Sequence, residues 1–366
     1  MKKILVNAYM AKNLGDDLFV KILLERYPNV EFIFTDYVIK NGAEEYRNVF
    51  INYKNVSFKY KYLNKYNILR RFLKNKVIKK QKFEKYDACI YIGGSIFMQI
   101  PQWKSQLEER LKCLSTLKKH QKPYFVLGAN FGPYYEEVFR SVYLDFFKEC
   151  KDVCFRDQYS KSLFLDLDNV RVHPDIVFQL KHKSKEKIEN TLGIVPINLK
   201  SIRGLEKYKA IYEEKIKDII CYAKGLDIKV TLFSFCKHLG DLDTIQSIYN
   251  NLSEEEQCYV TIVDYDGDID CFLDKFSEME SIVATRFHAC ILSQVFNQGV
   301  YPLIYSDKTY YSLLDLELAE YYTYIKEIEN LNIKDLFTNI KKNKIYNKSL
   351  LKSSERQFEK LDQFLL

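Results

Sequence analysis

Short β-type runs alternate with helical patterns along this 366-residue chain, and this alternation constrains its fold more than any other feature. It is typical of βαβ units, whose strands form a parallel sheet covered by helices. A first series of strands is expected at residues 3–8, 30–35, 88–92, 123–127, 152–155 and 170–172. A second series is expected at residues 192–197, 228–235, 259–263, 281–285 and 301–304. The fold class predicted from this pattern is α/β.

Two domains are expected, because the length corresponds to two units of about 150 residues plus an appendage. The charged stretch Lys181 to Asn190 has no strand character and is interpreted as the linker. A Rossmann-like domain is thus predicted at 1–182, a second one at 183–330, and a Lys-rich helical tail at 331–366. Two such parallel-sheet domains would face each other across a cleft at the carboxyl ends of their strands, where open α/β sheets bind ligands.

The composition is that of a globular protein and favours a cytoplasmic location. Charged residues form 29% and hydrophobic residues 47% of the chain, which argues against long disordered segments. The nine cysteines include no C-x-x-C pair, so reduced thiols are expected rather than a disulfide scaffold or a zinc site. No apolar run approaches the roughly 18 residues of a membrane-spanning helix. The apolar stretch after Met1 is too short for a signal peptide.

The net charge of +7 is concentrated in one segment. Residues 54–85 contain twelve Lys or Arg and one acid, so the rest of the chain is slightly acidic. Leu69, Phe72, Leu73 and Val77 recur there at helical spacing. This pattern predicts either a basic amphipathic helix on an anionic membrane surface or an ordinary solvated helix. Nucleic-acid binding is disfavoured, because no helix-turn-helix, zinc or ribonucleoprotein signature accompanies the charge.

Glycine-rich loops follow three of the expected strands in the first half. Asn13-Leu14-Gly15-Asp16-Asp17 opens a helix, where free N–H groups favour anions, although Asn13 or Asp16 could also be a simple N-cap. Gly93-Gly94-Ser95 and the loop from Gly128 to Pro133, which contains Asn130, follow two later strands. Because parallel strands end at the same edge of a sheet, these loops are expected to line one rim.

Charged side chains follow other strands and are expected at the same rim or facing it. Arg156 comes directly after a strand, and Asp175 stands near the end of the first half, where it could orient Arg156 or a substrate hydroxyl. In the second half, Arg286 and His288 stand at a strand-to-helix turn, and Lys308 follows the next strand. Three cations and an imidazole that converge on one cleft predict a compact, multiply charged ligand such as a phosphorylated carboxylic acid.

The ordered set of motifs NLGDD, GGSIF, GANFGP, FRDQYS, HPDIVF, ATRFHA and YSDK resembles the bacterial polysaccharide pyruvyl transferase family. The resemblance runs from about Asn13 to Lys308. It implies a fold like that of two-domain GT-B glycosyltransferases. It also implies phosphoenolpyruvate as donor and a sugar of a lipid-linked oligosaccharide or polysaccharide of the cell surface as acceptor, with a pyruvate ketal as product. The family's functional residues fall on Arg156, Arg286, His288 and Lys308. The first motif lacks the glycine that often precedes it, and the second has two glycines where three are common.

The resemblance and the residues together give an expected division of roles. The donor is expected to bind to Arg156, Arg286, His288 and Lys308, with backbone N–H groups of Gly94, Ser95 or Asn130. His288 is the preferred general acid and later base, assisted by Arg286, and Asp16 or Asp175 is a weaker candidate for the base that takes the hydroxyl proton. The acceptor is expected near Asn13, Asp16 and Asp175. No metal and no cofactor beyond phosphoenolpyruvate are expected. The alternative is a GT-B glycosyltransferase with a nucleotide-sugar donor.

Overall fold

A parallel sheet organises each half of the chain in the computed structural model, which describes residues 1–9, 12–35, 56–59, 83–345 and 348–366. In this described part, the first sheet has seven strands in the order β3-β2-β1-β4-β5-β6-β7, and the second has six in the order β10-β9-β8-β11-β12-β13. The first sheet contains β1 (Lys3–Ala8), β2 (Glu31–Thr35), β3 (Val56–Lys59), β4 (Ala88–Ile92), β5 (Tyr124–Ala129), β6 (Asp152–Phe155) and β7 (Val170–Val172). The second contains β8 (Ile188–Val195), β9 (Lys229–Ser234), β10 (Val260–Asp264), β11 (Met279–Ala284), β12 (Gly299–Ile304) and β13 (Thr323–Tyr324). These two parallel-sheet domains confirm the predicted fold class.

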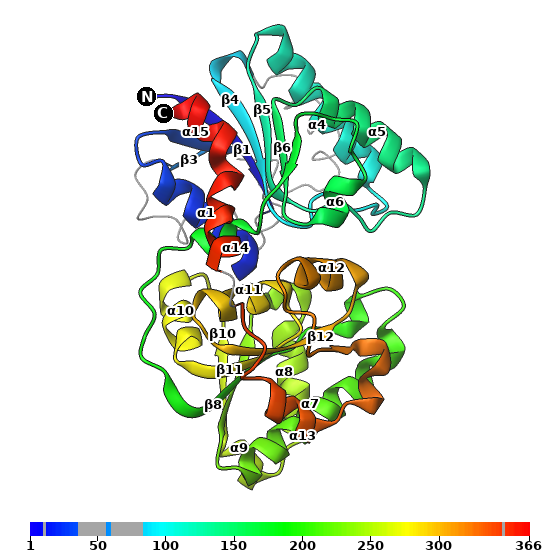
Figure 1. Cartoon of the computed structure of the whole chain (residues 1–366), viewed down its shortest axis with the longest axis vertical. Helices are drawn as coiled ribbons and strands as arrows, with labels where there is room; N and C mark the ends of the chain where they lie inside the picture. The colour runs from blue at the N-terminus through cyan, green and yellow to red at the C-terminus, as the bar shows by residue number, and fades with distance from the viewer. Residues whose placement is uncertain (10–11, 36–55, 60–82, 346–347) are drawn as a thin grey trace, which may run out of the picture.

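Helices cover both faces of the first sheet (Figure 1). Ile4 and Val6 of β1 pack in one hydrophobic cluster with α1 (Leu14–Arg26), whereas Leu5 points to the other cluster with α4 (Trp103–Lys119) and α5 (Glu137–Lys148). The alternation follows from the period of two in a strand. Shorter helices of this half are η1 (Phe83–Lys85), α6 (Gln158–Ser162) and η2 (Ile176–Gln179).

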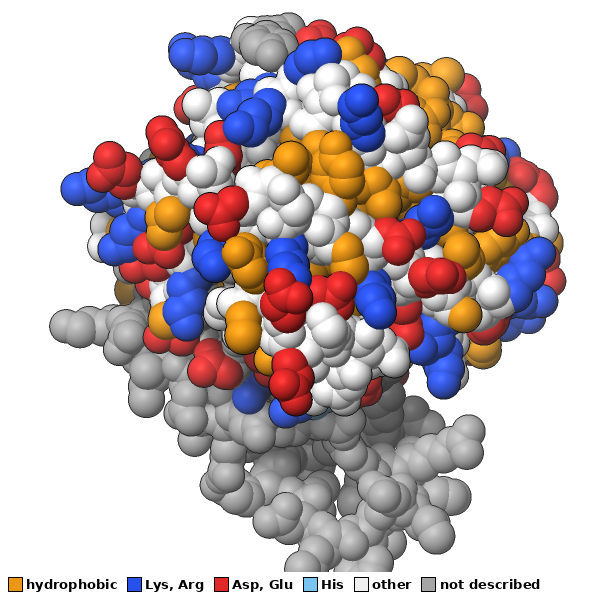
Figure 2. Space-filling model, turned by 90° about the horizontal axis from the view of Figure 1, so that it is seen from below, with side chains coloured by type: hydrophobic (Ala, Val, Ile, Leu, Met, Phe, Trp, Pro, Cys, Tyr) orange, Lys and Arg blue, Asp and Glu red, His pale blue; other side chains and the backbone are white. Residues whose placement is uncertain are grey.

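The second domain repeats this arrangement around its own sheet. Its helices are η3 (Leu199–Ser201), η4 (Glu206–Tyr208), α7 (Lys209–Gly225), η5 (Lys237–Leu239), α8 (Asp241–Asn250), α9 (Glu254–Gln257), α10 (Ile269–Ser277), α11 (Phe287–Val295), α12 (Asp307–Asp315), η6 (Ile325–Asn330) and α13 (Ile333–Asn339). In the end-on view of Figure 2, acidic and basic side chains intermingle with small hydrophobic areas. Among the described residues, no helix is long and apolar enough to cross a membrane.

Helix α1 lies between the two domains and is buried on nearly all sides. Its apolar side chains belong to a single cluster that also contains Phe235 and Phe272 of the second domain. The amide of Leu14 donates to the Phe235 carbonyl at 3.1 Å, and the Tyr265 hydroxyl donates to Asp17 at 2.8 Å. A helix without a polar face is typical of such a central position. The amino end of α1 is therefore fixed against the second domain.

The tail predicted at 331–366 divides between the two domains. Helix α13 packs on α7 of the second domain. The segments α14 (Lys348–Ser353), η7 (Ser354–Phe358) and α15 (Glu359–Leu365) return to the first domain, where both termini lie (Figure 1). Asp362 accepts hydrogen bonds from Arg26 at 2.7 Å and Tyr27 at 2.6 Å. The chain thus ends on the domain in which it begins.

Several expectations about individual segments are corrected. Strand β8 begins at Ile188, inside the predicted linker, because its first residues are exposed and their charged side chains tolerate a ladder with β11. Residues 56–59, at the start of the basic segment 54–85, form β3, which pairs with β2 and was not predicted. The apolar residues from Leu69 to Val77 lie outside the described residues. Helices α10 and α12, each nine residues long, were not predicted.

Candidate functional site

The carboxyl edge of the first sheet faces the amino end of α11 (Figure 1), and side chains from both domains meet there. Arg156 follows β6, and His288 stands in the first turn of α11. The Nη1 atom of Arg156 lies 3.3 Å from Nε2 of His288. Because a guanidinium only donates hydrogen bonds, Nε2 of His288 is the acceptor in this contact. The predicted meeting of these two side chains across the cleft is confirmed.

Arg156 is held by three further groups of the first domain and the facing helix. Its Nη1 donates to Asp175 at 2.8 Å, and its Nη2 donates to the Asn130 side-chain oxygen at 2.9 Å. The guanidinium carbon lies 4.3 Å from the ring centre of Phe287, a distance suited to a cation–π contact. The Arg156 side chain is only 3% exposed. Its orientation is therefore fixed before any ligand binds.

Two glycines leave room for these side chains. A Cβ on Gly94 would stand 2.7 Å from Nη1 of Arg156, and a Cβ on Gly15 would stand 1.9 Å from Nδ1 of His288. Both distances are shorter than van der Waals contact allows, so any larger residue would displace the guanidinium or the imidazole. The glycines of the predicted loops therefore admit the functional side chains.

Arg286 forms a second ion pair in the same region. Its Nε donates to Oδ2 of Asp241 at 3.0 Å, and its Nη2 donates to Oδ1 of the same buried carboxylate. Burial opposes the charge of Arg286, but the attraction of Asp241 outweighs it and raises the pKa of Arg286 above its ordinary value. Among the described residues, Nη1 of Arg286 has no hydrogen-bond partner. This nitrogen is the part of the pair that can receive an anion.

Tyr9 and Asp16 lie close to Arg286. Burial raises the pKa of Tyr9, and the negative charge of Asp16 raises it further, while Arg286 lowers it. Asp16 is half-buried, next to the glycine that contacts His288. The placement of Asp16 near Arg286 and His288 therefore agrees with the predicted geometry.

Buried carboxylates balance the two arginines of the site: the pairing of Asp175 with Arg156 agrees with one of the roles expected for Asp175, whereas the pairing of Asp241 with Arg286 was not predicted. A fixed carboxylate orients a guanidinium but cancels its long-range attraction. Helix α11 supplies a further anion-binding feature, the positive end of its dipole, and its N-cap Arg286 makes no side-chain capping bond there.

The remaining predicted residues have more local roles. The Asn13 side chain accepts from Gly15 N at 3.3 Å as the N-cap of α1. Both carboxylate oxygens of Asp175 accept hydrogen bonds, one from Arg156 and one from Val177 N. Of the two roles expected for Asp175, these contacts agree with orienting Arg156 rather than binding a substrate hydroxyl.

Hydrogen bonds within the protein occupy some of the groups that were expected to bind the donor substrate. The backbone N–H of Asn130 already donates to the Gly94 carbonyl at 2.9 Å and is not free for a ligand. The Ser95 hydroxyl donates to the Asn130 side-chain oxygen at 3.1 Å. Lys308 stands in the first turn of α12, but its side chain lies outside the described part. Across the described residues, no group of three or more His, Cys, Asp or Glu could hold a metal ion.

Asp241 and Phe287 are site residues that the sequence analysis missed. Asp241 begins α8, 45 residues before Arg286. No local pattern marks such a partner, although an acid at a helix start beside the predicted rim was a usable signal. Phe287 lay between two predicted residues and was passed over as an apolar spacer.

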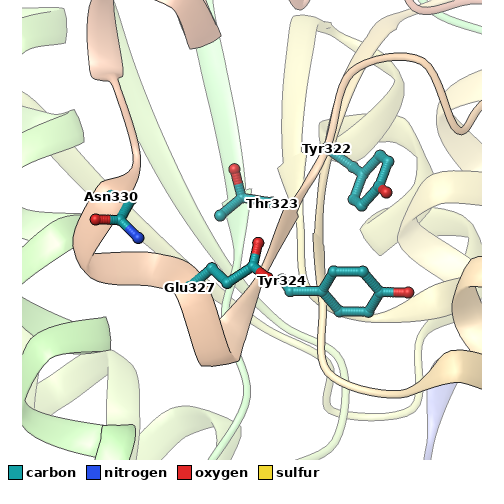
Figure 3. A pocket seen from close by; sticks show the side chains of 5 residues that line it. All are labelled: Tyr322, Thr323, Tyr324, Glu327 and Asn330. Carbon is teal, nitrogen blue, oxygen red and sulfur yellow. The ribbon is translucent and has the colours of Figure 1, made fainter.

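An open pocket lies at the edge of the second sheet, beside α12 (Figure 3). It has a volume of about 240 Å³ and is lined by Tyr322, Thr323, Tyr324, Glu327 and Asn330. The ring of Tyr310 on α12 lies 5.6 Å from that of Tyr322. On the same helix, Tyr311 stacks on Tyr159 of the first domain at 5.0 Å, nearly parallel. A row of tyrosines thus leads from the domain boundary to this pocket.

Comparisons with known proteins agree with this architecture. The family model described as polysaccharide pyruvyl transferase matches residues 13–307. A search of curated proteins found no match. Among solved structures, Anabaena HepE in complex with UDP-glucose is 10% identical with a TM-score of 0.57, covering 100% of this chain and 98% of its own.

Two further structures show the same likeness. The Staphylococcus aureus MnaA–UDP structure is 14% identical with a TM-score of 0.60, covering 100% of this chain and 98% of its own. The Methanocaldococcus jannaschii UDP-GlcNAc 2-epimerase with UDP-GlcNAc and UDP is 13% identical with a TM-score of 0.60, covering 99% of this chain and 100% of its own. At such identities the likeness shows a GT-B-like fold alone.

Proposed function

The chain belongs to the polysaccharide pyruvyl transferase family, and on this premise we propose that it transfers pyruvate from phosphoenolpyruvate to a cell-surface glycan precursor. The product is a pyruvate ketal that bridges two hydroxyls of one sugar. A pyruvyltransferase activity and a glycan acceptor follow from the family, whereas the donor, the ketal and the kind of glycan are our proposal. The contact between Arg156 and His288 at 3.3 Å is the observation that carries it.

The donor is proposed to lie between Arg156, Arg286 and the amino end of α11. Its phosphate and carboxylate need several donors at once, and the free Nη1 of Arg286 and the first amides of α11 are suited to receive them. The carboxylates of Asp175 and Asp241 hold the two guanidiniums in place, so little reorganisation is needed when the anion binds. Lys308, at the start of α12, is proposed to add a further positive charge.

His288 is proposed to protonate the methylene carbon of the donor. In the free protein its Nε2 faces the Arg156 guanidinium, which disfavours a second proton on the imidazole. A bound trianion offsets that positive charge and favours the imidazolium. His288 would thus become an acid when its substrate arrives, and the proton it gives to the methylene carbon makes the neighbouring carbon electrophilic.

The remaining steps form two carbon–oxygen bonds and break one. A sugar hydroxyl attacks the electrophilic carbon. The bond between this carbon and the phosphate oxygen breaks, and phosphate leaves with the bonding electron pair. A neighbouring hydroxyl then closes the ring. Of the two hydroxyl protons, one returns to His288 and replaces the proton that it gave to the methylene carbon. The other leaves with phosphate. Asp16, close to His288 through Gly15, is proposed as the base for the attacking hydroxyl. These steps require no cofactor besides the co-substrate.

The acceptor is proposed to extend along the tyrosine row into the pocket of Tyr322, Tyr324, Glu327 and Asn330. Aromatic faces pack against the C–H faces of sugars, while carboxylate and amide groups bind their hydroxyls. Tyr322→Ala and Glu327→Gln are expected to raise the KM for an oligosaccharide acceptor several-fold and to leave the KM for phosphoenolpyruvate unchanged. Equal KM values for the acceptor in variant and wild-type protein would contradict this placement.

The proposed activity is tested by incubating the protein with phosphoenolpyruvate and candidate lipid-linked oligosaccharides. Mass spectrometry is expected to show the gain of a pyruvyl group and release of phosphate. A parallel thermal-shift titration compares phosphoenolpyruvate with UDP-sugars, because the true donor stabilises the folded state. Stabilisation by a UDP-sugar alone, with sugar transfer, would instead identify a nucleotide-sugar glycosyltransferase.

A cytoplasmic location and peripheral contact with an anionic membrane are part of the same proposal. The basic segment 54–85 would bring the enzyme to lipid-linked acceptors at the inner face, and nucleic acid is not among the proposed partners. Co-sedimentation with vesicles that contain phosphatidylserine is expected to be salt-sensitive and to weaken when the basic residues of 60–82 are replaced. Binding that is independent of both salt and these residues would contradict it.

A further inference from the structure

Gln357 enters the first domain from the C-terminal tail and reaches three of its strand ends. The side chain is fully buried. Its Oε1 accepts from Gly128 N at 3.1 Å, and its Nε2 donates to Phe155 O at 3.0 Å and His173 O at 2.6 Å. The orientation of the amide is defined, because a backbone donor faces its oxygen and backbone carbonyls face its nitrogen. One amide therefore connects segments that are far apart in the sequence.

Each of these backbone groups lies next to a residue of the site. Gly128 precedes Asn130 by two positions, Phe155 precedes Arg156, and the Pro174 carbonyl, 3.2 Å from Nε2, precedes Asp175. The side chains of Asn130, Arg156 and Asp175 are in turn joined by the hydrogen bonds that fix Arg156. The three segments that carry this network thus share Gln357 as a common support.

The tail is itself anchored at this point. Arg171 of β7 donates from Nη2 to the Gln357 carbonyl at 2.8 Å and forms a two-pronged pair with Asp152 of β6, at 2.7 and 2.9 Å. Because the backbone of Gln357 is held in this way, its side-chain amide keeps a fixed position relative to the three strand ends. Residues that lock neighbouring loops determine how well a site is preorganised.

We propose that Gln357 is a positioning residue for pyruvyl transfer, which acts through Arg156 on the imidazole of His288. It lies 50 residues beyond the part of the chain that matches the family model, 13–307. Its amide sets the spacing of the segments that carry Asn130, Arg156 and Asp175, and thereby the direction of the guanidinium toward His288. The activity measurement rests on the proposed function, whereas the position of the imidazole can be measured independently.

Gln357→Glu is the sharpest test, because it keeps the shape of the side chain but turns an acceptor toward three carbonyls. Gln298→Glu is the matched control. Gln298 is also fully buried, and its Nε2 donates to the carbonyls of Phe276 at 2.7 Å and Met279 at 2.8 Å. These partners lie at the amino end of β11, at the edge of the second sheet opposite the site. Both variants lose comparable buried hydrogen bonds, and only one of them supports the site.

The expected results separate positioning from stability. Both variants should unfold at lower urea concentration than the wild-type protein. Gln357→Glu is expected to lower kcat by about 10- to 100-fold, since a misplacement of about 1 Å in a site has effects of that size, whereas Gln298→Glu should change kcat by less than about twofold in this comparison. The ¹⁵N resonances of the His288 imidazole should shift in the first variant and stay in place in the second.

Several outcomes would overturn the proposal. It is wrong if folded Gln357→Glu keeps its kcat and the His288 resonances, or if Gln298→Glu changes them equally. If the Glu variant does not fold, Gln357→Met, which introduces no charge, takes its place in the same measurements. Unchanged His288 resonances in folded Gln357→Met would equally overturn the proposal. If the wild-type protein transfers no pyruvate, the proposed function fails, while the resonances of His288 still decide the role of Gln357.

Discussion

The imidazole of His288 lies close to both a guanidinium and a carboxylate of the first domain. Arg156 donates to Nε2 at 3.3 Å, while the carboxylate of Asp175 lies 3.8 Å from the same nitrogen. The imidazole is thus placed between a cation and an anion that already pair with each other. In the proposed mechanism, a bound phosphate changes this balance in favour of the imidazolium. The proposal therefore links proton transfer to donor binding.

Replacing His288 by glutamine tests this role at the level of a single side chain. His288→Gln keeps a polar group near Arg156 but cannot deliver a proton, so kcat for pyruvyl transfer should fall by about 10²- to 10⁴-fold, the usual contribution of a general acid. The exposed His120 offers a matched control, and His120→Gln should leave kcat unchanged. Initial rates of phosphate release measure both. Near-wild-type activity of folded His288→Gln would remove His288 from the mechanism.

Gly15→Ala probes the space beside the same imidazole. The new Cβ would stand 1.9 Å from Nδ1 of His288, so the ring has to move and kcat should fall at least about tenfold. Gly225→Ala is the control, because a Cβ there meets nothing within 4 Å and the residue ends α7. That change is expected to be neutral or to stabilise by up to about 1 kcal/mol. The two variants are compared by steady-state kinetics and urea unfolding.

If Gly15→Ala is as active as Gly225→Ala, the packing of the imidazole against α1 has no catalytic importance.

The sequence was sufficient to predict which residues meet, but not how their charges are balanced. Arg156 and His288 could be brought together because each follows a strand of a parallel sheet, and the carboxyl edges of the two sheets were expected to face each other across a cleft. Asp241 could not be assigned to Arg286, since an ion pair across 45 residues leaves no periodic trace in the sequence. The bonds of Gln357 are equally invisible, because a single amide in a charged tail resembles any solvated residue.

At the scale of elements, apolar runs in the sequence predicted the buried strands well, but they did not predict strand segments that are exposed or lie at a sheet edge. Strands β1, β4 and β6 were predicted with the bounds that the structure gives, because their side chains are buried in continuous runs. The start of β8 was missed because its first three residues are exposed and carry no hydrophobic pattern. Strand β3 was not predicted, since its position is set by pairing with β2 rather than by its own composition. Tertiary pairing overrides local preference in such edge segments.

The contact between β7 and the C-terminal tail gives a pH-dependent prediction. Burial and the positive charges of Arg171 and Arg356 together lower the pKa of His173 to about 4, while Glu359 opposes them. The unfolded chain, with a pKa near 6.5 for this histidine, takes up the proton first as the pH falls. Stability is therefore unaffected above about pH 6.5 and is lost progressively between pH 6.5 and 4.

His173→Gln should remove this part of the acid destabilisation. Because the side chain is partly exposed, the difference is expected to be about 1 kcal/mol between pH 7 and pH 4.5 rather than the full value of the shift. Urea unfolding of wild-type and variant protein at both pH values measures it. His120→Gln, which changes an exposed histidine, should behave like the wild type. If the free energy of unfolding has the same pH dependence in all three proteins, His173 does not contribute to the acid destabilisation.

At the scale of the whole molecule, two connections hold the domains in register. Helix α1 shares its hydrophobic cluster with the second domain, and the tail crosses from the second domain back to the first. The site lies where these connections converge, since α1 contacts His288 through Gly15 and the tail supports the segment of Arg156 through Gln357. Domain arrangement and site geometry are therefore expected to change together.

Tyr265→Phe tests this coupling. The Tyr265 hydroxyl crosses the domain boundary to Asp17, and both residues are buried, so its loss should cost about 1–3 kcal/mol of unfolding free energy. It should also loosen α1, which faster amide hydrogen exchange in residues 14–26 would reveal, and raise the KM for phosphoenolpyruvate several-fold. Tyr143→Phe is the matched control, because that buried hydroxyl binds Arg110 within the first domain alone. It should lower stability by a similar amount and leave the KM for the donor as it is. Equal effects of the two variants on donor KM would mean that the boundary contact contributes stability without holding the site.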